Sequence, residues 1–326
     1  MQGIQGRAVR LPSVVAHADW SVDRSKRLMA VARLVPGGAG NGYGYRVVSL
    51  AAAPDGRGDD GDLFQVLGDM SHPDRLVVGF DFPIGLPSKY AAAAGIGSFP
   101  KFLDALGSPS WREFDVVAER PSQITLRRPF YPSRPGGTSR ENLYRGLGLS
   151  ATDLRRRCEG TDAETLFWTL GGKQVGKAAL TGWRLLRHAR QREPGIALWP
   201  FDGAFPDLLA GTGHVVVAET YPREYYRHFG VTAGGRRWSK RRHRDRLALV
   251  PALLRWAESL PVTWDARVEQ RVREGFSDGR TGEDEFDAVA GLLAIIGVVT
   301  GAIATGEPRD DAAVVSTEGW ILGRAS

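Results

Sequence analysis

The fold of this chain is organised around residues 76–87, which have the sequence LVVGFDFPIGLP. The first five residues are apolar or small, which is typical of a buried strand. Asp81 follows, and the prolines and glycine after it end ladder pairing and force a turn. We therefore expect Asp81 at the carboxyl end of a central strand, where open α/β sheets bind their ligands. The alternative is that Asp81 only begins an Asx turn before Pro83.

The composition is that of a globular protein with a substantial core. Of the 326 residues, 42% are hydrophobic and 25% are charged, which excludes a disordered polypeptide. The longest apolar stretch, residues 288–304, is short and contains three glycines. The N-terminus has no apolar signal core, so we expect no membrane segment and a cytoplasmic protein. The single cysteine, Cys158, excludes an internal disulfide and a multi-cysteine zinc site.

Alternating and apolar patterns predict three further strands before the Asp81 strand. They are predicted at residues 14–20, 28–35 and 43–50, followed by a helix over residues 59–70. Short loops make the first three strands an antiparallel meander, and a helical crossover lets the fourth lie parallel to the first. This order places Asp19, near the end of the first strand, beside Asp81 on adjacent central strands.

The predicted core is discontinuous. We expect residues 13–82 and 214–326 to form a mixed sheet flanked by helices, and residues 83–213 to be a large, mainly helical insertion that covers the active edge. Helical segments are predicted there at residues 151–157 and 178–190. After the insertion, the pattern predicts a strand ending near Glu219, an amphipathic helix over 247–260 and a buried helix over 281–304. Thr281 is its predicted N-cap, and residues 318–322 form a last edge segment.

Acidic residues recur at positions where strands end or helices begin. Asp19 and Glu219 lie near strand ends, Asp81 closes the central strand, and Asp284 and Asp287 share a helix face. Carboxylates that converge repel one another unless a cation neutralises them, and Mg²⁺ or Mn²⁺ is the natural partner of an all-oxygen ligand set. Two such ions activate water and stabilise the leaving oxygen in phosphodiester cleavage.

Several of these segments together are similar to those of a known family. They are Ala18-Asp19-Trp20, residues 80–87 (FDFPIGLP), residues 219–222 (ETYP), residues 284–288 (DEFDA) and residues 318–321 (EGWI). In order, they resemble the landmarks of domain-of-unknown-function family 429, whose members are predicted ribonuclease H-like nucleases. The segment DEFDA also resembles the last acids of Holliday-junction resolvases. The resemblance spans residues 14–322 but leaves most of the insertion unexplained.

The resemblance implies a ribonuclease H-like fold and metal-dependent hydrolysis. It implies catalytic roles for Asp19, Asp81, Glu219, Asp284 and Asp287, with all of these except Asp284 as metal ligands. His17 departs from the apolar or glycine residue expected there and lies on the strand face of Asp19. It either tunes the metal site or simply packs.

Each acid also has a purely structural interpretation. Asp284 and Asp287 favour the positive end of a helix dipole without any ligand. Glu219 is close enough in sequence to pair with an arginine such as Arg223.

A basic segment follows Glu219. Residues 223–246 hold nine basic residues against two acids, with Tyr225, Tyr226, Phe229 and Trp238 interleaved. Cations for phosphates and rings for bases are what a nucleic-acid groove requires, although a charge run is often only a solvated face. The predicted contacts are Arg223, Arg236, Arg237, Lys240, Arg241, Arg242 and Arg244.

Two smaller motifs are weaker. Residues 171–177 (GGKQVGK) resemble a phosphate loop but lack its spacing and its preceding strand. Cys158 follows three arginines that favour a thiolate, but no histidine partner is recognisable.

The sequence therefore predicts a nuclease that hydrolyses DNA or RNA with Mg²⁺ or Mn²⁺ at a carboxylate-held two-metal site. One alternative keeps the fold but takes a small phosphorylated or nucleotide-like molecule. Another is a nucleic-acid-binding protein without catalysis.

Overall fold

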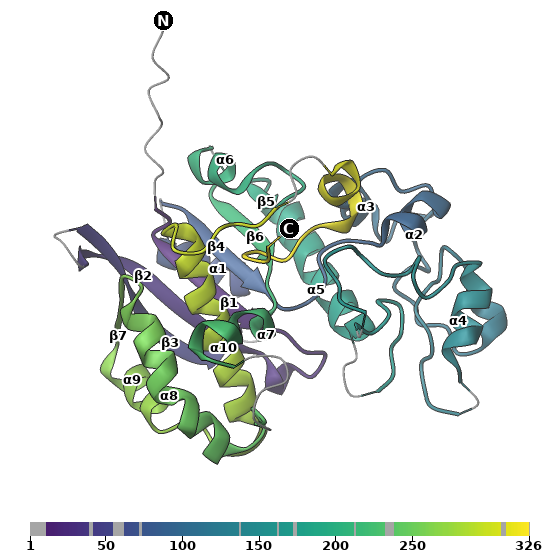
Figure 1. The fold of residues 1–326 in the computed structure, drawn as a ribbon. Coiled ribbons are helices and arrows are strands. Elements are labelled where there is room, and N and C mark those ends of the chain that lie inside the picture. Colours follow the sequence, from purple (N-terminus) through teal and green to yellow (C-terminus); the bar gives the residue numbers. More distant parts are fainter. Residues whose placement is uncertain are drawn as a thin grey trace, which may run out of the picture.

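The computed structural model describes residues 11–38, 42–54, 62–71, 74–136, 138–161, 163–171, 175–211, 213–231, 238–307 and 311–325. Within them the chain forms a seven-stranded mixed sheet with the strand order β5-β6-β4-β1-β2-β3-β7. Helices cover both faces of this sheet (Figure 1). The strands are β1 (Val14–Asp19), β2 (Leu28–Gly38), β3 (Gly42–Ala52), β4 (Leu76–Phe80), β5 (Ile196–Leu198), β6 (Val215–Glu219) and β7 (Val262–Trp264). The predicted α/β class is confirmed.

The predicted meander and crossover are also confirmed. Strands β1, β2 and β3 pair antiparallel in succession, and β4 pairs parallel to β1 after the helix α1 (Leu63–Ser71). Ala18 lies opposite Phe80 in this register. The next residue of each strand is an acid, so Asp19 and Asp81 are neighbours at the carboxyl ends of two central strands, as the sequence predicted.

Helices from different parts of the chain cover the two faces. They are α2 (Ser88–Ala93), α3 (Phe99–Ala105), α4 (Arg140–Leu147), α5 (Val175–Arg192), α6 (Phe205–Ala210), α7 (Pro222–Tyr225), α8 (His243–Glu258), α9 (Ala266–Arg273) and α10 (Gly279–Val299). Short 3₁₀ segments are η1 (Arg24–Lys26), η3 (Pro121–Gln123) and η4 (Tyr226–Phe229), and η5 (Val314–Glu318) is a π-helix. Helix α10 packs across β1 and β2, with α8 beside it (Figure 1).

Helix α10 is buried over most of its length, as its uniformly apolar sequence predicts. It begins earlier than expected, because Asp278 and not Thr281 is the N-cap residue. None of the helices among the described residues is long and apolar enough to span a membrane.

The range predicted as an insertion joins the core of the sheet. Its strand β5 pairs parallel with β6 and extends one edge of the sheet. Its helix α5 packs so closely that a Cβ on Gly182 would lie 2.4 Å from the ring of Phe82. Phe99 and Trp183 belong to the same hydrophobic cluster as β1 and β4. Residues 83–213 therefore contribute both an edge strand and one covering layer.

One predicted helix of this range is wrong. Residues 151–157 form turns and not a helix. Within this segment, the Arg156 guanidinium points inward and is buried against Glu219. The predicted helix at 178–190 is confirmed within α5.

Candidate functional site

Strand alternation places Asp19 and Asp81 on the face of the sheet that α10 covers. On β1, residues two apart share a face, so Asp19 lies on the side of Val15, which packs in the cluster beneath α10. Asp81 follows β4 on the same side. Its Oδ1 accepts a hydrogen bond of 2.6 Å from the backbone N–H of Trp20, and the carboxyls of Asp19 and Asp81 are hydrogen-bonded to each other. The carboxyl at the end of β1 and the carboxyl just after β4 thus face each other.

Helix α10 adds a second pair of acids to this face. Asp287 is buried, with its Oδ1 accepting from the hydroxyl of Tyr226 and its Oδ2 from the ammonium of Lys240. Asp284, one turn earlier, is half-buried. Both charges act on Asp19. We call Asp19, Asp81, Asp284 and Asp287 the acid cluster.

Burial makes these carboxylates unfavourable as anions. Burial, followed by the charges of Asp81 and Asp287, raises the pKa of Asp19 well above its usual range. Burial raises the pKa of Asp81 to about 6, against the hydrogen bonds from Asp19 and the Trp20 N–H. Burial and then the charge of Glu283 raise the pKa of Asp284 to about 7. The cluster therefore retains protons near neutral pH, and a bound cation would replace them.

His17 sets the spacing between the sheet and α10. A Cβ on Gly291 would lie 2.3 Å from the His17 ring, so the helix approaches the strand only because that residue is glycine. Burial lowers the pKa of His17 to about 3, so the ring is neutral at physiological pH. The close contact with Gly291 fits the packing role of the two that the sequence left open for His17. Gly291, against which the His17 ring packs, lies one turn along α10 from Asp287.

Glu219 does not join the acid cluster, in contrast to the prediction. It lies opposite Phe80 in the register, so its side chain points to the other face of the sheet. Its oxygens accept bonds of 2.6 and 2.7 Å from the Arg156 guanidinium, and Oε2 accepts one of 2.7 Å from the N–H of Ile84. Glu219 is thus an ion-pair partner, although the partner is Arg156 and not Arg223.

Sequence reasoning missed Arg156, and it missed Lys240 and Tyr226 as partners of Asp287. Arg156 lies 63 residues from Glu219, inside a run of three arginines. Nothing in that run distinguishes the buried arginine from its neighbours. Lys240 was predicted to bind nucleic acid, but its ammonium contacts Asp287 and, at 3.3 Å, Glu283.

The donor atoms of the acid cluster fit a hard divalent cation in kind, because all are carboxylate oxygens. Among the described residues, however, no three His, Cys, Asp or Glu side chains are placed to hold one metal ion together. The hydrogen-bonded pair of Asp19 and Asp81 is the part that fits one cation. On the same face, the buried hydroxyl of Thr220 has no hydrogen-bond partner. The acid cluster therefore fits one divalent cation, at the carboxyls of Asp19 and Asp81.

The basic segment lies beside the acid cluster, but its side chains are differently disposed than predicted. Arg236 and Arg237 lie outside the described residues, and Arg223 lies in α7. Arg241 pairs with Glu283 at 3.4 Å, while Arg242 and Arg244 pair with Asp245 at 2.7 and 3.5 Å. The side chains of Arg241 and Arg244 are 76% and 79% exposed. Exposed pairs of this kind are weak, so both cations can still meet phosphate.

The aromatic residues of that segment are not available to stack on bases. Tyr225, Tyr226 and Phe229 are buried, and Tyr226, Phe229 and Trp238 pack around Phe286 of α10. Their role is to anchor the segment to α10.

The two weaker motifs gain no support. Cys158 is buried, and burial raises the pKa of its thiol well above the usual range, in contrast to the activation that its arginine neighbours suggested. Residues 172–174 lie outside the described residues, and Gly176 and Lys177 belong to α5.

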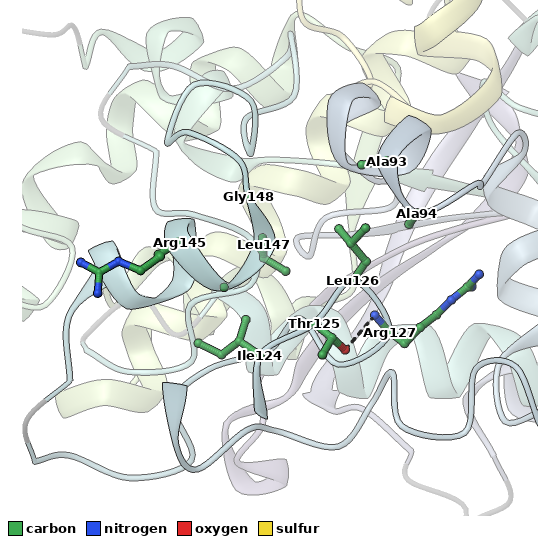
Figure 2. A pocket seen from close by; sticks show the side chains of 10 residues that line it. Ala93, Ala94, Ile124, Thr125, Leu126, Arg127, Arg145, Leu147 and Gly148 are labelled. Atoms are coloured by element: carbon green, nitrogen blue, oxygen red, sulfur yellow. Dashed lines mark hydrogen bonds between the residues drawn. The ribbon is translucent and has the colours of Figure 1, made fainter. Parts of the chain in front are cut away.

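A shallow pocket of about 600 Å³ lies elsewhere, between α2, α4 and the turn at residues 124–127 (Figure 2). Its floor is apolar, and Arg127 and Arg145 extend to opposite sides of it. No acidic residue lines it. The guanidinium of Arg127 is already stacked over Trp111, at 3.7 Å from the ring centroid. The residues that line the pocket include no Asp, Glu, His or Cys that could act as an acid, a base or a nucleophile.

The comparisons with known proteins return no match: no protein-family model fits the chain, and neither a curated protein nor a solved structure is significantly similar to it.

Proposed function

We propose that this protein is a metal-dependent phosphodiester hydrolase of the ribonuclease H-like type that acts on nucleic acid. The observation that carries the proposal is the hydrogen-bonded pair of buried Asp19 and half-buried Asp81, with buried Asp287 across from it on α10. Buried like charges without a matching set of donors are costly, and such costs are concentrated at functional sites.

The topology supports the same proposal. A three-stranded meander precedes a helical crossover and a parallel fourth strand, and the last long helix packs on the face of Asp19 and Asp81. This is the arrangement that the sequence resemblance implies for a ribonuclease H-like protein. Its acids come from the ends of two central strands and from that helix.

The residues have distinct roles in the proposed site. Asp19 and Asp81 would hold the cation, and the Trp20 N–H keeps Asp81 oriented through a hydrogen bond of 2.6 Å. Tyr226 and Lys240 fix both oxygens of Asp287. When bound, a divalent cation lowers the pKa of a coordinated water and so supplies the nucleophile. Asp284, whose pKa is raised to about 7, is placed to accept a proton near neutral pH.

The substrate class rests on the charges around the acid cluster. Arg241 contacts Glu283, the residue before Asp284, and the first turn of α8 continues the exposed cations. A polyanion that lies along these cations reaches the acid cluster. A small phosphorylated molecule would need fewer of these exposed cations, so their number favours a polyanionic substrate.

The test measures cleavage of single-stranded, duplex and branched DNA and RNA with Mg²⁺, Mn²⁺ or chelator. We expect cleavage with metal only, and loss of at least about 100-fold in Asp19→Asn and Asp81→Asn. Asp115→Asn, which removes a half-buried carboxylate that pairs with Arg184 away from the acid cluster, is the matched control and should retain activity. Cleavage that survives Asp81→Asn would contradict the proposal. Metal-dependent hydrolysis of nucleotides without polymer cleavage would favour the small-molecule alternative.

A further inference from the structure

The two halves of the acid cluster differ in how their charge is balanced. Asp287 has a cation in contact, because the Lys240 ammonium donates to its Oδ2. Within the described part of the chain, no ion pair reaches Asp19 or Asp81, whose carboxyls bond to each other and to the Trp20 N–H. Asp287 thus has a protein cation in direct contact, whereas the charge of Lys240 acts on Asp19 and Asp81 without an ion pair to either.

Lys240 is held firmly in this position. Its ammonium contacts Asp287 and lies 3.3 Å from Glu283 Oε1, and its side chain is only 35% exposed. The second oxygen of Asp287 is taken by the hydroxyl of Tyr226. Trp238, two residues before Lys240, packs on Tyr226 and Phe286, which ties this part of the chain to α10. A metal ion at Asp287 would have to displace the ammonium.

We propose that Lys240 is a built-in second cation, so that the chain takes up one divalent ion, at Asp19 and Asp81, where a two-metal hydrolase takes up two. This inference rests on the proposed function and narrows it. In a two-metal site both ions stabilise the attacking and leaving oxygens. An ammonium fixed across from a single ion supplies the second positive charge, and it requires no further carboxylates.

The proposal also accounts for the absence, among the described residues, of a three-carboxylate metal group. A second ion would require Asp287 and Glu283 together, and both already contact Lys240. The Asp19 and Asp81 pair, by contrast, has carboxylate oxygens that would gain most from a cation, because burial and mutual repulsion oppose their ionisation.

The test is the number of Mn²⁺ ions bound per chain, measured without substrate by electron paramagnetic resonance of free Mn²⁺. We expect one ion in the wild-type protein and none at this site in Asp81→Asn. Lys240→Gln and Lys240→Met should bind a second ion, because Asp287 and Glu283 lose their cation. Lys240→Arg keeps the charge and should bind one. Arg241→Gln is the matched control, since Arg241 contacts the same Glu283, and it should also bind one.

The outcomes separate the two proposals. Two Mn²⁺ ions of similar affinity in the wild-type protein would overturn the role of Lys240 while leaving a metal-dependent hydrolase intact, whatever the variants do. A single ion both in the wild type and in folded Lys240→Gln or Lys240→Met would overturn it as well. No Mn²⁺ binding by the wild-type chain would overturn the proposed function itself.

Discussion

Carboxylates at neighbouring strand ends have opposite surroundings on the two faces of the sheet. On one face, Glu219 meets a matched set of donors: the two terminal guanidinium nitrogens of Arg156 and the N–H of Ile84. On the other face, Asp19 and Asp81 meet chiefly each other. The strands are adjacent and parallel, so position in the sheet does not explain the difference.

The comparison teaches that burial and strand-end position alone do not identify a catalytic acid. A carboxylate whose lone pairs are filled by fixed donors is part of the structure, and replacing its partner leaves a buried unpaired charge. A carboxylate that faces another carboxylate is stable only with a proton or a cation. The following experiments test this distinction, beginning with the largest expected effect.

Arg156→Met should lower the free energy of unfolding by about 3–5 kcal/mol, because it leaves the buried Glu219 without its cation. Urea denaturation monitored by circular dichroism measures the change. Arg157→Met is the matched control, since that side chain is 51% exposed and pairs with Asp311 at the surface, and it should cost about 1 kcal/mol or less. Equal losses in the two variants would mean that the Arg156 pair has no special structural role.

Asp81→Asn should have the opposite sign. In chelator at pH 8 we expect a gain of about 1–3 kcal/mol, because the cost of holding a desolvated charge at Asp81 and its repulsion with Asp287 disappear while the amide oxygen still accepts from the Trp20 N–H. Thermal melting with and without Mg²⁺ or Mn²⁺ measures the gain, and the added metal should no longer raise Tm.

Glu219→Gln, on the other face, should lower Tm in the same assay, because it leaves the buried Arg156 guanidinium without its carboxylate. A clear drop in Tm for Asp81→Asn, together with an unchanged response to metal, would remove Asp81 from the proposed site.

The pH dependence of the free energy of unfolding should also reflect the unfavourable ionisation of Asp81. The pKa of Asp81 is raised to about 6 in the folded chain, above its ordinary value of 3.8. The folded state therefore holds a proton that the unfolded state has lost, and this contribution declines as pH rises from about 4 through about 6. In chelator, we expect the wild-type Tm to fall relative to that of Asp81→Asn between about pH 4 and about pH 7. Saturating Mn²⁺ should abolish the difference, whereas a difference that persists with metal would contradict a shared cation site.

The smallest effect on stability is expected at the surface cations. Replacing Arg241, Arg242 and Arg244 by alanine should change the free energy of unfolding by about 0.5 kcal/mol or less. It should weaken nucleic-acid binding and reduce the salt slope by up to about 3, because fewer counterions are released. Fluorescence anisotropy at several salt concentrations measures both. The charge-matched control replaces Arg46, Arg184 and Arg273, which lie on other elements. If both triple variants have the same salt slope of nucleic-acid binding, the basic segment is only a solvated surface.

Local patterns in the sequence predicted five of the seven strands and the pairing of the first four, but they did not predict the edge strands β5 and β7. The run ending in Asp81, the meander before it and the apolar helix α10 were all predicted, because alternation, apolar runs and turn residues are local properties of the chain. The same patterns brought Asp19 beside Asp81, since parallel strands end at one edge of the sheet. The broad assignment of Asp284 and Asp287 to one face of a helix start needed only helical periodicity.

Tertiary structure decided which face each acid occupies and what it meets there. A shift of one residue in register turns a side chain to the other face. Glu219 is aligned with Phe80 and not with Asp81, so its side chain lies on the face opposite the acid cluster. Its partner, Arg156, comes from a distant turn that no local pattern marks. Lys240 has the same residue type as a phosphate-binding cation, yet it contacts Asp287. Partners so far apart in sequence are chosen by packing and electrostatics, which a single sequence does not display.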